Sequence, residues 1–257
     1  MRCLVLALLA GIASGFAGAA SAADLKPLYK APPPPPVVDL WTGFYVGVNG
    51  GYSWGPWDST SVAPIFPSAA GLTTTASPDV NGWVAGIQGG YSWRINNTWL
   101  AGLEADIQAT GERDTTTGSI TIAVGGGTTT ITENAEWKFP WFATFRGRVG
   151  ALIDPSTLIY LTGGLAVGRF EFTDTSTATV NLAGVTATAS IVTSESTTRL
   201  GGTVGAGIER KFSPNWSAKA EFLYLDFGTH TFLAGTGFDT SVRLNDYIGR
   251  VGVNYRF

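Results

Sequence analysis

The chain ends in a stretch that alternates between two kinds of residue, Asp246-Tyr-Ile-Gly-Arg-Val-Gly-Val-Asn-Tyr-Arg-Phe257. From Tyr247 every second residue is apolar or glycine, and after Ile248 the residues between them are arginine, glycine or asparagine. A period of two predicts a β-strand with one apolar and one polar face. A tilted strand of roughly 9–11 residues crosses a bilayer. The stretch therefore predicts the closing strand of a membrane barrel, with an aromatic residue at its end.

Segments of the same kind precede it, and the connections between them alternate in length. The predicted strands are residues 41–54, 80–95, 99–109, 136–152, 158–172, 199–212, 216–227 and 242–257. Three connections are short and carry the Asn, Asp, Pro and Ser of tight turns, namely residues 96–98, 153–157 and 213–215. The other four are long, namely residues 55–79, 110–135, 173–198 and 228–241.

This alternation predicts an all-β, eight-stranded antiparallel up-and-down barrel. Every short turn then lies at one end, together with both termini, and every long loop lies at the other. Outer-membrane barrels have this layout, with short periplasmic turns and long extracellular loops. Gly125-Gly-Gly127 separates two runs of Thr and Ile and predicts a hairpin that extends two strands beyond the membrane. Residues 173–198 alternate in the same way.

Alternation alone also fits a soluble barrel, so the environment of each face needs a separate argument. Charged residues make up 14% of the chain, whereas soluble domains carry roughly 25%, so there are too few to coat a soluble surface. One face carries charges of both signs, and buried charges need partners. This predicts a membrane barrel with ion pairs in its lumen, formed by Glu104, Asp106, Glu209, Glu221, Arg146, Arg148, Arg250, Lys211 and Lys219, with Arg256 on the same face.

The opposite face is predicted to contact lipid. Aromatic residues near the strand ends predict the two interfacial girdles, formed by Trp41, Trp54, Trp93, Trp99, Trp137, Trp141, Trp216, Tyr247 and Phe257. In residues 136–152 the period places Trp137 and Phe139 outward, and Glu136 and Lys138 inward. Arg169 and Arg210 also fall on the outward face, where they would be awkward at the bilayer midplane.

The amino terminus predicts export. Residues 1–22 have the basic start, apolar middle and A-x-A end of a secretory signal peptide. Residues 23–40, with prolines from Pro32 to Pro36, form a stiff, extended periplasmic lead-in, and residues 41–257 form the barrel. The single cysteine, Cys3, leaves with the signal peptide, so no disulfide or thiolate site is expected. No later stretch is apolar for long enough to form a transmembrane helix.

The chain also resembles a known family. The resemblance rests on Ala22-Ala-Asp-Leu, the proline run, Trp41-Thr-Gly-Phe-Tyr-Val-Gly-Val-Asn-Gly-Gly-Tyr-Ser-Trp, Trp216-Ser-Ala-Lys-Ala-Glu-Phe-Leu-Tyr-Leu-Asp-Phe-Gly228 and Val251-Gly-Val-Asn-Tyr-Arg-Phe257. These segments resemble the porin-like outer-membrane β-barrels of alpha-proteobacteria, which include immunogenic proteins of the OmpA-like type and some that bind haem. The resemblance implies fold and location, with no catalytic motif to carry over, and it implies that Phe257 is read by the barrel-assembly machinery.

We expect no catalytic, cofactor-binding or metal site, and no enzyme activity. His230 is the only histidine, and a lone histidine cannot make a usual metal site; haem ligation stays a minor alternative to a solvated loop residue. Glu104 and Asp106 share a face, where salt-bridge partners are the simpler reading. The net charge of −3 gives no basic footprint, so nucleic acid is not an expected partner.

The sequence thus predicts a structural, surface-exposed protein of the Gram-negative outer membrane, with a narrow lumen filled by side chains. Its expected partners are outer-membrane lipid and the barrel-assembly machinery; its oligomeric state is not indicated. A channel for ions or small solutes is the first alternative. Binding of a ligand such as haem, or of a host surface, by the long loops is the second. A soluble lipid-binding barrel is the rival at the level of the fold.

Overall fold

The computed structural model describes residues 40–57, 59–63, 72–76, 79–232 and 240–257. The expected signal peptide, and all of the lead-in except Leu40, lie outside the described residues. The description that follows concerns the unit Asp39–Phe257. Among the described residues, no helix has the length and apolarity that a membrane span requires.

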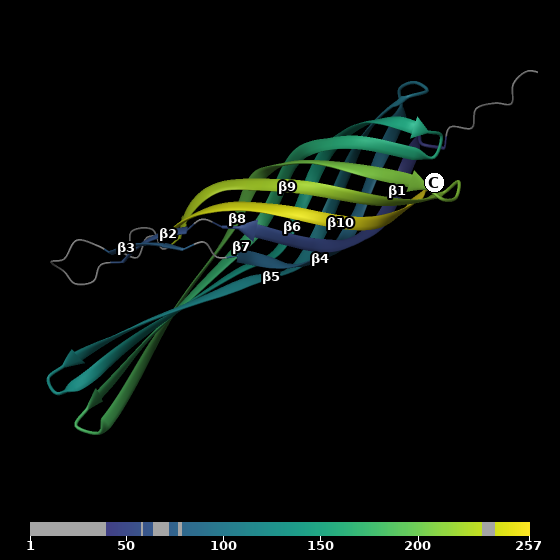
Figure 1. Ribbon diagram of the computed structural model, residues 1–257. Coiled ribbons are helices and arrows are strands. Elements are labelled where there is room, and N and C mark those ends of the chain that lie inside the picture. The colour runs from purple at the N-terminus through teal and green to yellow at the C-terminus, as the bar shows by residue number, and fades with distance from the viewer. Residues whose placement is uncertain (1–39, 58, 64–71, 77–78, 233–239) are drawn as a thin grey trace, which may run out of the picture. The chain divides into compact units, whose positions relative to one another are not determined.

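The described residues form strands throughout (Figure 1). Their bounds are β1 (Gly43–Pro56), β2 (Ser59–Ala63), β3 (Leu72–Ala76), β4 (Asp79–Arg94), β5 (Trp99–Val124), β6 (Gly127–Asp154), β7 (Thr157–Leu182), β8 (Val185–Lys211), β9 (Trp216–Phe232) and β10 (Thr240–Arg256). The long strands pair antiparallel in the order β1-β4-β5-β6-β7-β8-β9-β10, and β10 pairs again with β1. Eight strands therefore close into a ring, as the sequence predicts. The small β2–β3 hairpin pairs with β10 through residues 59–61.

The pairing of β10 with β1 confirms the prediction that the last strand closes the barrel. The last strand pairs with the first in a continuous register that runs from Tyr45 opposite Arg256 to Trp54 opposite Tyr247. Beyond the seam, Phe257 donates its backbone N–H to Phe44 at 3.1 Å. No strand edge is left open along this stretch. A strand surrounded by hydrocarbon must be paired on both sides, because unpaired backbone groups find no water there.

The short and long connections lie at opposite ends, which we call the turn end and the hairpin end. At the turn end, β4–β5, β6–β7 and β8–β9 are joined by the three predicted tight turns. At the hairpin end, β5–β6 and β7–β8 continue as paired strands to tips at Gly125–Gly126 and Ala183–Gly184. All four tip residues have positive φ, between 50° and 84°. Two consecutive positive φ angles match the twist of a hairpin, so both loops extend the strands as predicted.

A register shift in β6 reverses the two faces of this strand. Pairing with β5 skips from Ala109 to Glu112, and pairing with β7 skips from Lys138 to Trp141. Pro140 lies inside the second skip, and proline cannot donate to the ladder, so bulges accommodate it. The prediction for residues 136–139 is therefore wrong. Trp137 and Phe139 lie in the lumen, at 4% and 0% exposure, whereas Glu136 and Lys138 lie outside the core and form an ion pair at 2.9 Å.

The predicted girdles are confirmed only in part. Trp54, Trp93, Trp99, Trp216 and Phe257 are exposed on the outward face, and Trp141 and Tyr247 are half-buried. Trp41 and Trp137 are not girdle residues, because both are buried. The indole Nε1 of Trp41 donates to the Pro155 carbonyl at 3.0 Å, which fixes Trp41 against the β6–β7 turn at the turn end.

Candidate functional site

The lumen is the candidate site because the charged side chains predicted to form its ion pairs all face it. The nine predicted side chains and Arg256 are each at most 7% exposed. These residues are Glu104, Asp106, Glu209, Glu221, Arg146, Arg148, Arg250, Lys211, Lys219 and Arg256. The period of two explains this placement: on β10, alternate residues from Val242 to Arg256 are buried, apart from the half-buried Gly252, while Val251 and Phe257 on the other face are exposed.

Arg146 is the centre of the ion-pair network. It extends from β6 and contacts three carboxylates, at 2.5 Å from Glu104, 2.9 Å from Asp106 and 3.0 Å from Glu221. Its Nε donates to the hydroxyl of Thr144 at 2.9 Å. A guanidinium group in such a position satisfies its planar set of donors with charged acceptors, which makes strong, geometrically specific hydrogen bonds.

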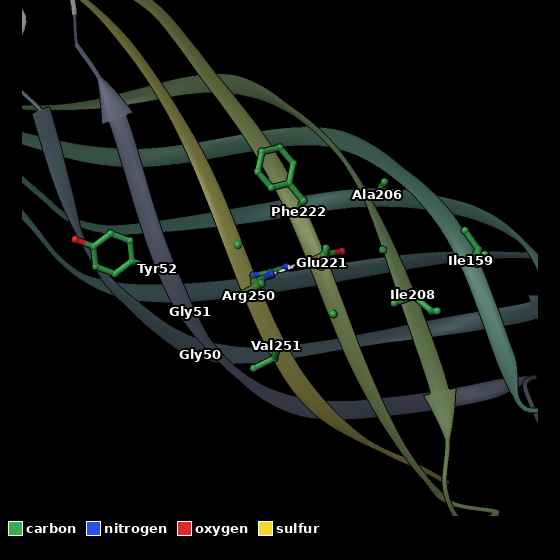
Figure 2. A pocket seen from close by; sticks show the side chains of 13 residues that line it. Gly50, Gly51, Tyr52, Ile159, Ala206, Ile208, Glu221, Phe222, Arg250 and Val251 are labelled. Atoms are coloured by element: carbon green, nitrogen blue, oxygen red, sulfur yellow. Dashed lines mark hydrogen bonds and ion pairs between the residues drawn. The ribbon is translucent and has the colours of Figure 1, made fainter.

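Two further cations complete this layer from the other side of the barrel. Lys219 on β9 contacts Glu104 on β5 at 2.9 Å. Arg250 on β10 contacts Glu221 at 2.6 Å and Asp106 at 3.1 Å. Figure 2 shows the Arg250–Glu221 contact between β10 and β9. Three cations and three carboxylates thus compensate one another, so each buried charge has the partner that burial demands.

Toward the turn end the network continues through Arg148 and Glu209. Arg148 lies 3.0 Å from Glu209 and stacks over the ring of Tyr45, with its guanidinium carbon 4.6 Å from the ring centroid. The Tyr45 hydroxyl donates to Glu104 at 2.8 Å, which joins this layer to the previous one. Asn254 donates to Glu209 at 3.2 Å and accepts from Gln88 at 2.6 Å.

A small apolar cluster lies at the turn end of the lumen. Trp41, Leu100, Leu158 and Tyr160 form a buried cluster. The ammonium group of Lys211 lies 5.2 Å from the centroid of the Trp41 ring, within the range of a cation–π contact, and also donates to the Pro214 carbonyl at 2.9 Å. Lys211 is thus held by an aromatic ring and a turn carbonyl at the mouth of the barrel.

A larger apolar cluster fills the hairpin end of the lumen, which the sequence interpretation missed. Its members on β6 lie on both sides of the bulge, and the others occupy lumen positions elsewhere. They are Trp57, Val80, Val84, Trp137, Phe139, Phe142, Ala166, Phe170, Phe172, Leu223, Leu225, Phe227, Phe232, Val242, Leu244 and Ile248. The rings of Phe139 and Phe170 stack at 4.6 Å, and Phe227 meets Phe170 edge-on at 5.0 Å. The signal was present in β9, where Leu223, Leu225 and Phe227 share the lumen-facing period of Lys219 and Glu221.

The barrel wall carries a hollow of about 800 Å³, lined by residues of β1, β7, β8, β9 and β10. It lies where outward positions hold small residues, such as Gly50 and Ala206 (Figure 2). Phe222 and Tyr52 stand at its border. Most of its lining is apolar or glycine, and it also includes Glu221 and Arg250 of the lumen network.

The other side chains singled out from the sequence, His230, Arg169 and Arg210, lie away from the ion-pair network. His230 is on β9, 3.3 Å from Arg199 and edge-on to Phe232 at 4.6 Å, so it packs within the hairpin end. Arg169 lies in the middle of β7, beside the β6 bulge, and contacts Glu171 at 2.9 Å. Arg210 is exposed next to the turn end, opposite Thr157. Within the described residues, no group of three or more acidic, histidine or cysteine side chains is arranged to hold a metal ion.

Comparison with known proteins agrees with this architecture. Residues 5–257 match the model of the outer membrane protein beta-barrel domain family. The chain is 34% identical to the 31 kDa outer-membrane immunogenic protein of Brucella melitensis, over 97% of this chain and 98% of that protein. It is 27% identical to a 22 kDa outer membrane protein of Rhizobium leguminosarum, over 77% of this chain and 69% of that protein.

Among solved structures, OprG of Pseudomonas aeruginosa aligns with 84% of this chain and 97% of its own, at 12% identity and a TM-score of 0.47. The attachment invasion locus protein of Yersinia pestis aligns with 83% of this chain and 99% of its own, at 14% identity and a TM-score of 0.35. The family match spans the whole barrel, and the expected family resemblance is confirmed. The chain belongs to the outer-membrane β-barrel family and is a protein of the outer membrane.

Proposed function

We propose that the chain is a structural, surface-exposed envelope protein whose lumen is closed by side chains. One observation carries this proposal: the Lys219–Glu104 ion pair, at 2.9 Å, joins opposite walls of the barrel. Glu104 is on β5 and Lys219 on β9, which are four strands apart in a ring of eight. A direct contact across the diameter occupies the centre of the lumen at that level.

The dimensions of the barrel support the same conclusion. An eight-stranded barrel has an interior just wide enough for side chains to fill. Here the contents are an apolar cluster at the hairpin end, a charged network in the middle and a second apolar cluster at the turn end. A channel would need a continuous polar path, and both apolar clusters oppose one.

A solute-uptake assay tests closure against the channel alternative. We expect vesicles that contain the folded barrel to swell no faster in a small sugar or amino acid than vesicles without protein. The preparation must first show the gel shift of a folded barrel on heating, so that inactivity cannot be attributed to misfolding. Swelling well above the protein-free rate, which falls as the solute becomes larger, would establish a pore and overturn the proposal.

We also propose that the hairpin end is extracellular and that both termini are periplasmic. The extensions of β5–β8 support this orientation, because their exposed Thr- and Ser-rich faces suit water and outer-membrane barrels carry their long loops outside. A protease site inserted between Gly125 and Gly126 should be cut in intact cells. The same site inserted after Asn97, at the turn end, should be cut only after the outer membrane is opened. The reverse pattern would invert the proposed orientation.

The proposed partners are outer-membrane lipid, along the outward wall, and the barrel-assembly machinery. Support for the second comes from Phe257, whose side chain is 73% exposed at the end of the closing strand. We expect removal of Phe257, or Phe257→Asp, to reduce the yield of heat-modifiable, protease-resistant barrel in cells severalfold. Phe212→Asp, at another exposed phenylalanine of the turn end, is the matched control. Equal yields from the parent and the Phe257 variants would refute a role in assembly.

We propose no catalytic role and no nucleic-acid partner. The carboxylates of Glu104 and Asp106 are both ion-paired with Arg146, so neither is placed to act as a general base. The ring nitrogens of His230 face Arg199 and Glu195, which leaves haem ligation without support from the geometry. If His230→Ala abolished haem binding by the folded barrel, the haem alternative would replace this part of the proposal.

A further inference from the structure

Two carboxyl groups in the lumen stand apart from the ion-pair network. Glu112 on β5 and Asp246 on β10 are 2% and 1% exposed. The two strands between them in the ring present small side chains, since β4 contributes Gly82 and β1 contributes Ser53 to the lumen face. Ser53 pairs with Gly82, and a Cβ on Gly82 would meet the backbone of Glu112, so Glu112 lies at the level where Ser53 contacts Asp246. The two carboxyl groups at this level also interact electrostatically.

The hydrogen bonding of this pair is incomplete. The Ser53 hydroxyl donates to Oδ2 of Asp246 at 2.5 Å, and this uses its only proton. Both oxygens of Glu112 and Oδ1 of Asp246 are buried and lack a hydrogen-bond partner among the described residues. Buried carboxylate oxygens without donors are costly, because they have lost their water and gained nothing in return.

The other buried carboxylates of the lumen differ from Glu112 and Asp246, because they are ion-paired. Glu104, Asp106, Glu209 and Glu221 each have a cationic nitrogen within 3.0 Å. In the described part of the chain, neither Glu112 nor Asp246 has an ion pair of this kind. Two adjacent buried carboxylates that both carried a charge would repel each other in an environment of low polarity, so one of them must be neutralised.

Among the described residues, the side chains around the pair do not supply the missing positive charge. Described lumen-facing neighbours are neutral: Trp57 just after β1, Val80 and Val84 on β4, Gln108 on β5, Phe139 and Phe142 on β6, Leu223 and Leu225 on β9, and Leu244 and Ile248 on β10. The next cation along the lumen face of β10 is Arg250, which is committed to Glu221 and Asp106. Arg113 and Lys138, next to this level, lie on the outward face.

We propose that Glu112 and Asp246 form a proton-binding site that holds one proton between them at neutral pH. The protonated member becomes a donor and the other remains a buried acceptor, as in known carboxyl pairs that share a proton. A divalent cation fits this place less well, because Ca²⁺ takes six to eight oxygen ligands and Mg²⁺ keeps several waters. The pair offers few oxygens, and the surrounding side chains are mostly apolar.

Such a site links stability to pH with a defined sign. Unfolded carboxyl groups release their protons at about pH 4. Above that pH the folded barrel binds one more proton than the unfolded chain, so the free energy of unfolding decreases as pH rises until the folded pair ionises. Glu112→Gln supplies a permanent amide donor in place of the proton, so this part of the pH dependence should disappear.

Infrared spectroscopy of the folded barrel in lipid vesicles tests the site directly. At neutral pH we expect a carbonyl stretching band from a protonated carboxyl group, which Glu112→Gln or Asp246→Asn removes and Glu171→Gln, at a partly exposed carboxylate, retains. The two variants act independently, so one suffices if the other fails to fold. Absence of the band from the parent barrel would overturn the proposal, as would a band that survives both substitutions. A parent band that appears only after a chelator is added would assign the pair to a bound metal instead.

Discussion

Arg146→Ala is expected to lower the free energy of unfolding by about 3–5 kcal/mol, the cost of breaking a buried ion pair by removing one partner. Arg146 contacts Glu104, Asp106 and Glu221, all within 3.0 Å. Its loss leaves three buried carboxylates to be compensated by Lys219, Arg250 and the more distant Arg148, which lies 3.9 Å from Glu104. Urea unfolding of the barrel in lipid vesicles, followed by tryptophan fluorescence, measures the change.

Arg169→Ala is the matched control for this substitution. Arg169 also contacts a carboxylate at 2.9 Å, but both side chains are partly exposed. Exposed ion pairs contribute at most about 1 kcal/mol, so the control should lose no more than that. If the two arginine variants lost the same small amount of stability, the lumen network would not be the structural centre of the barrel.

Leu165→Arg should lower the free energy of unfolding by about 2–4 kcal/mol, the cost of a cation on the lipid face near the bilayer midplane. Leu165 is 56% exposed on the outward wall and lies between the β6–β7 turn and Arg169. Because its surroundings are hydrocarbon in the membrane, an arginine there loses its water without gaining a partner.

Ile120→Arg provides a comparison at almost equal exposure. Ile120 is 58% exposed, but it lies in the extension of β5 at the hairpin end. There the substitution meets water, and an ordinary surface change costs within about 0.5 kcal/mol. Similar losses at the two positions would place both in the same environment and would contradict the assignment of the outward wall to lipid.

The sequence predicts most of the barrel because two local signals repeat along it. The period of two assigns each residue to a face, and the turn residues mark where the chain reverses. Together they predict the ring, the seam between Tyr45 and Arg256 and the lumen position of residues such as Arg146. These features depend on neighbours in sequence and on closure, and neither requires knowledge of what lies across the lumen.

The failures come from places where the period is interrupted or where contacts cross the barrel. Pro140 shifts the register of β6, so counting alone puts Trp137 and Phe139 on the wrong face. Trp41 resembles a girdle residue in the sequence, because its hydrogen bond to the Pro155 carbonyl forms only when the fold brings the two residues together. The meeting of Glu112 and Asp246 depends on two intervening strands, and no pattern within either strand indicates it.

The conductance of single barrels in a planar lipid bilayer tests the central claim, that side chains close the lumen. Protein whose folded state is verified by its gel shift on heating should insert without producing discrete current steps. The ion pair between Lys219 and Glu104, together with the apolar clusters at either end, predicts this absence of current steps. Steady openings of reproducible size, from protein free of other porins, would contradict it.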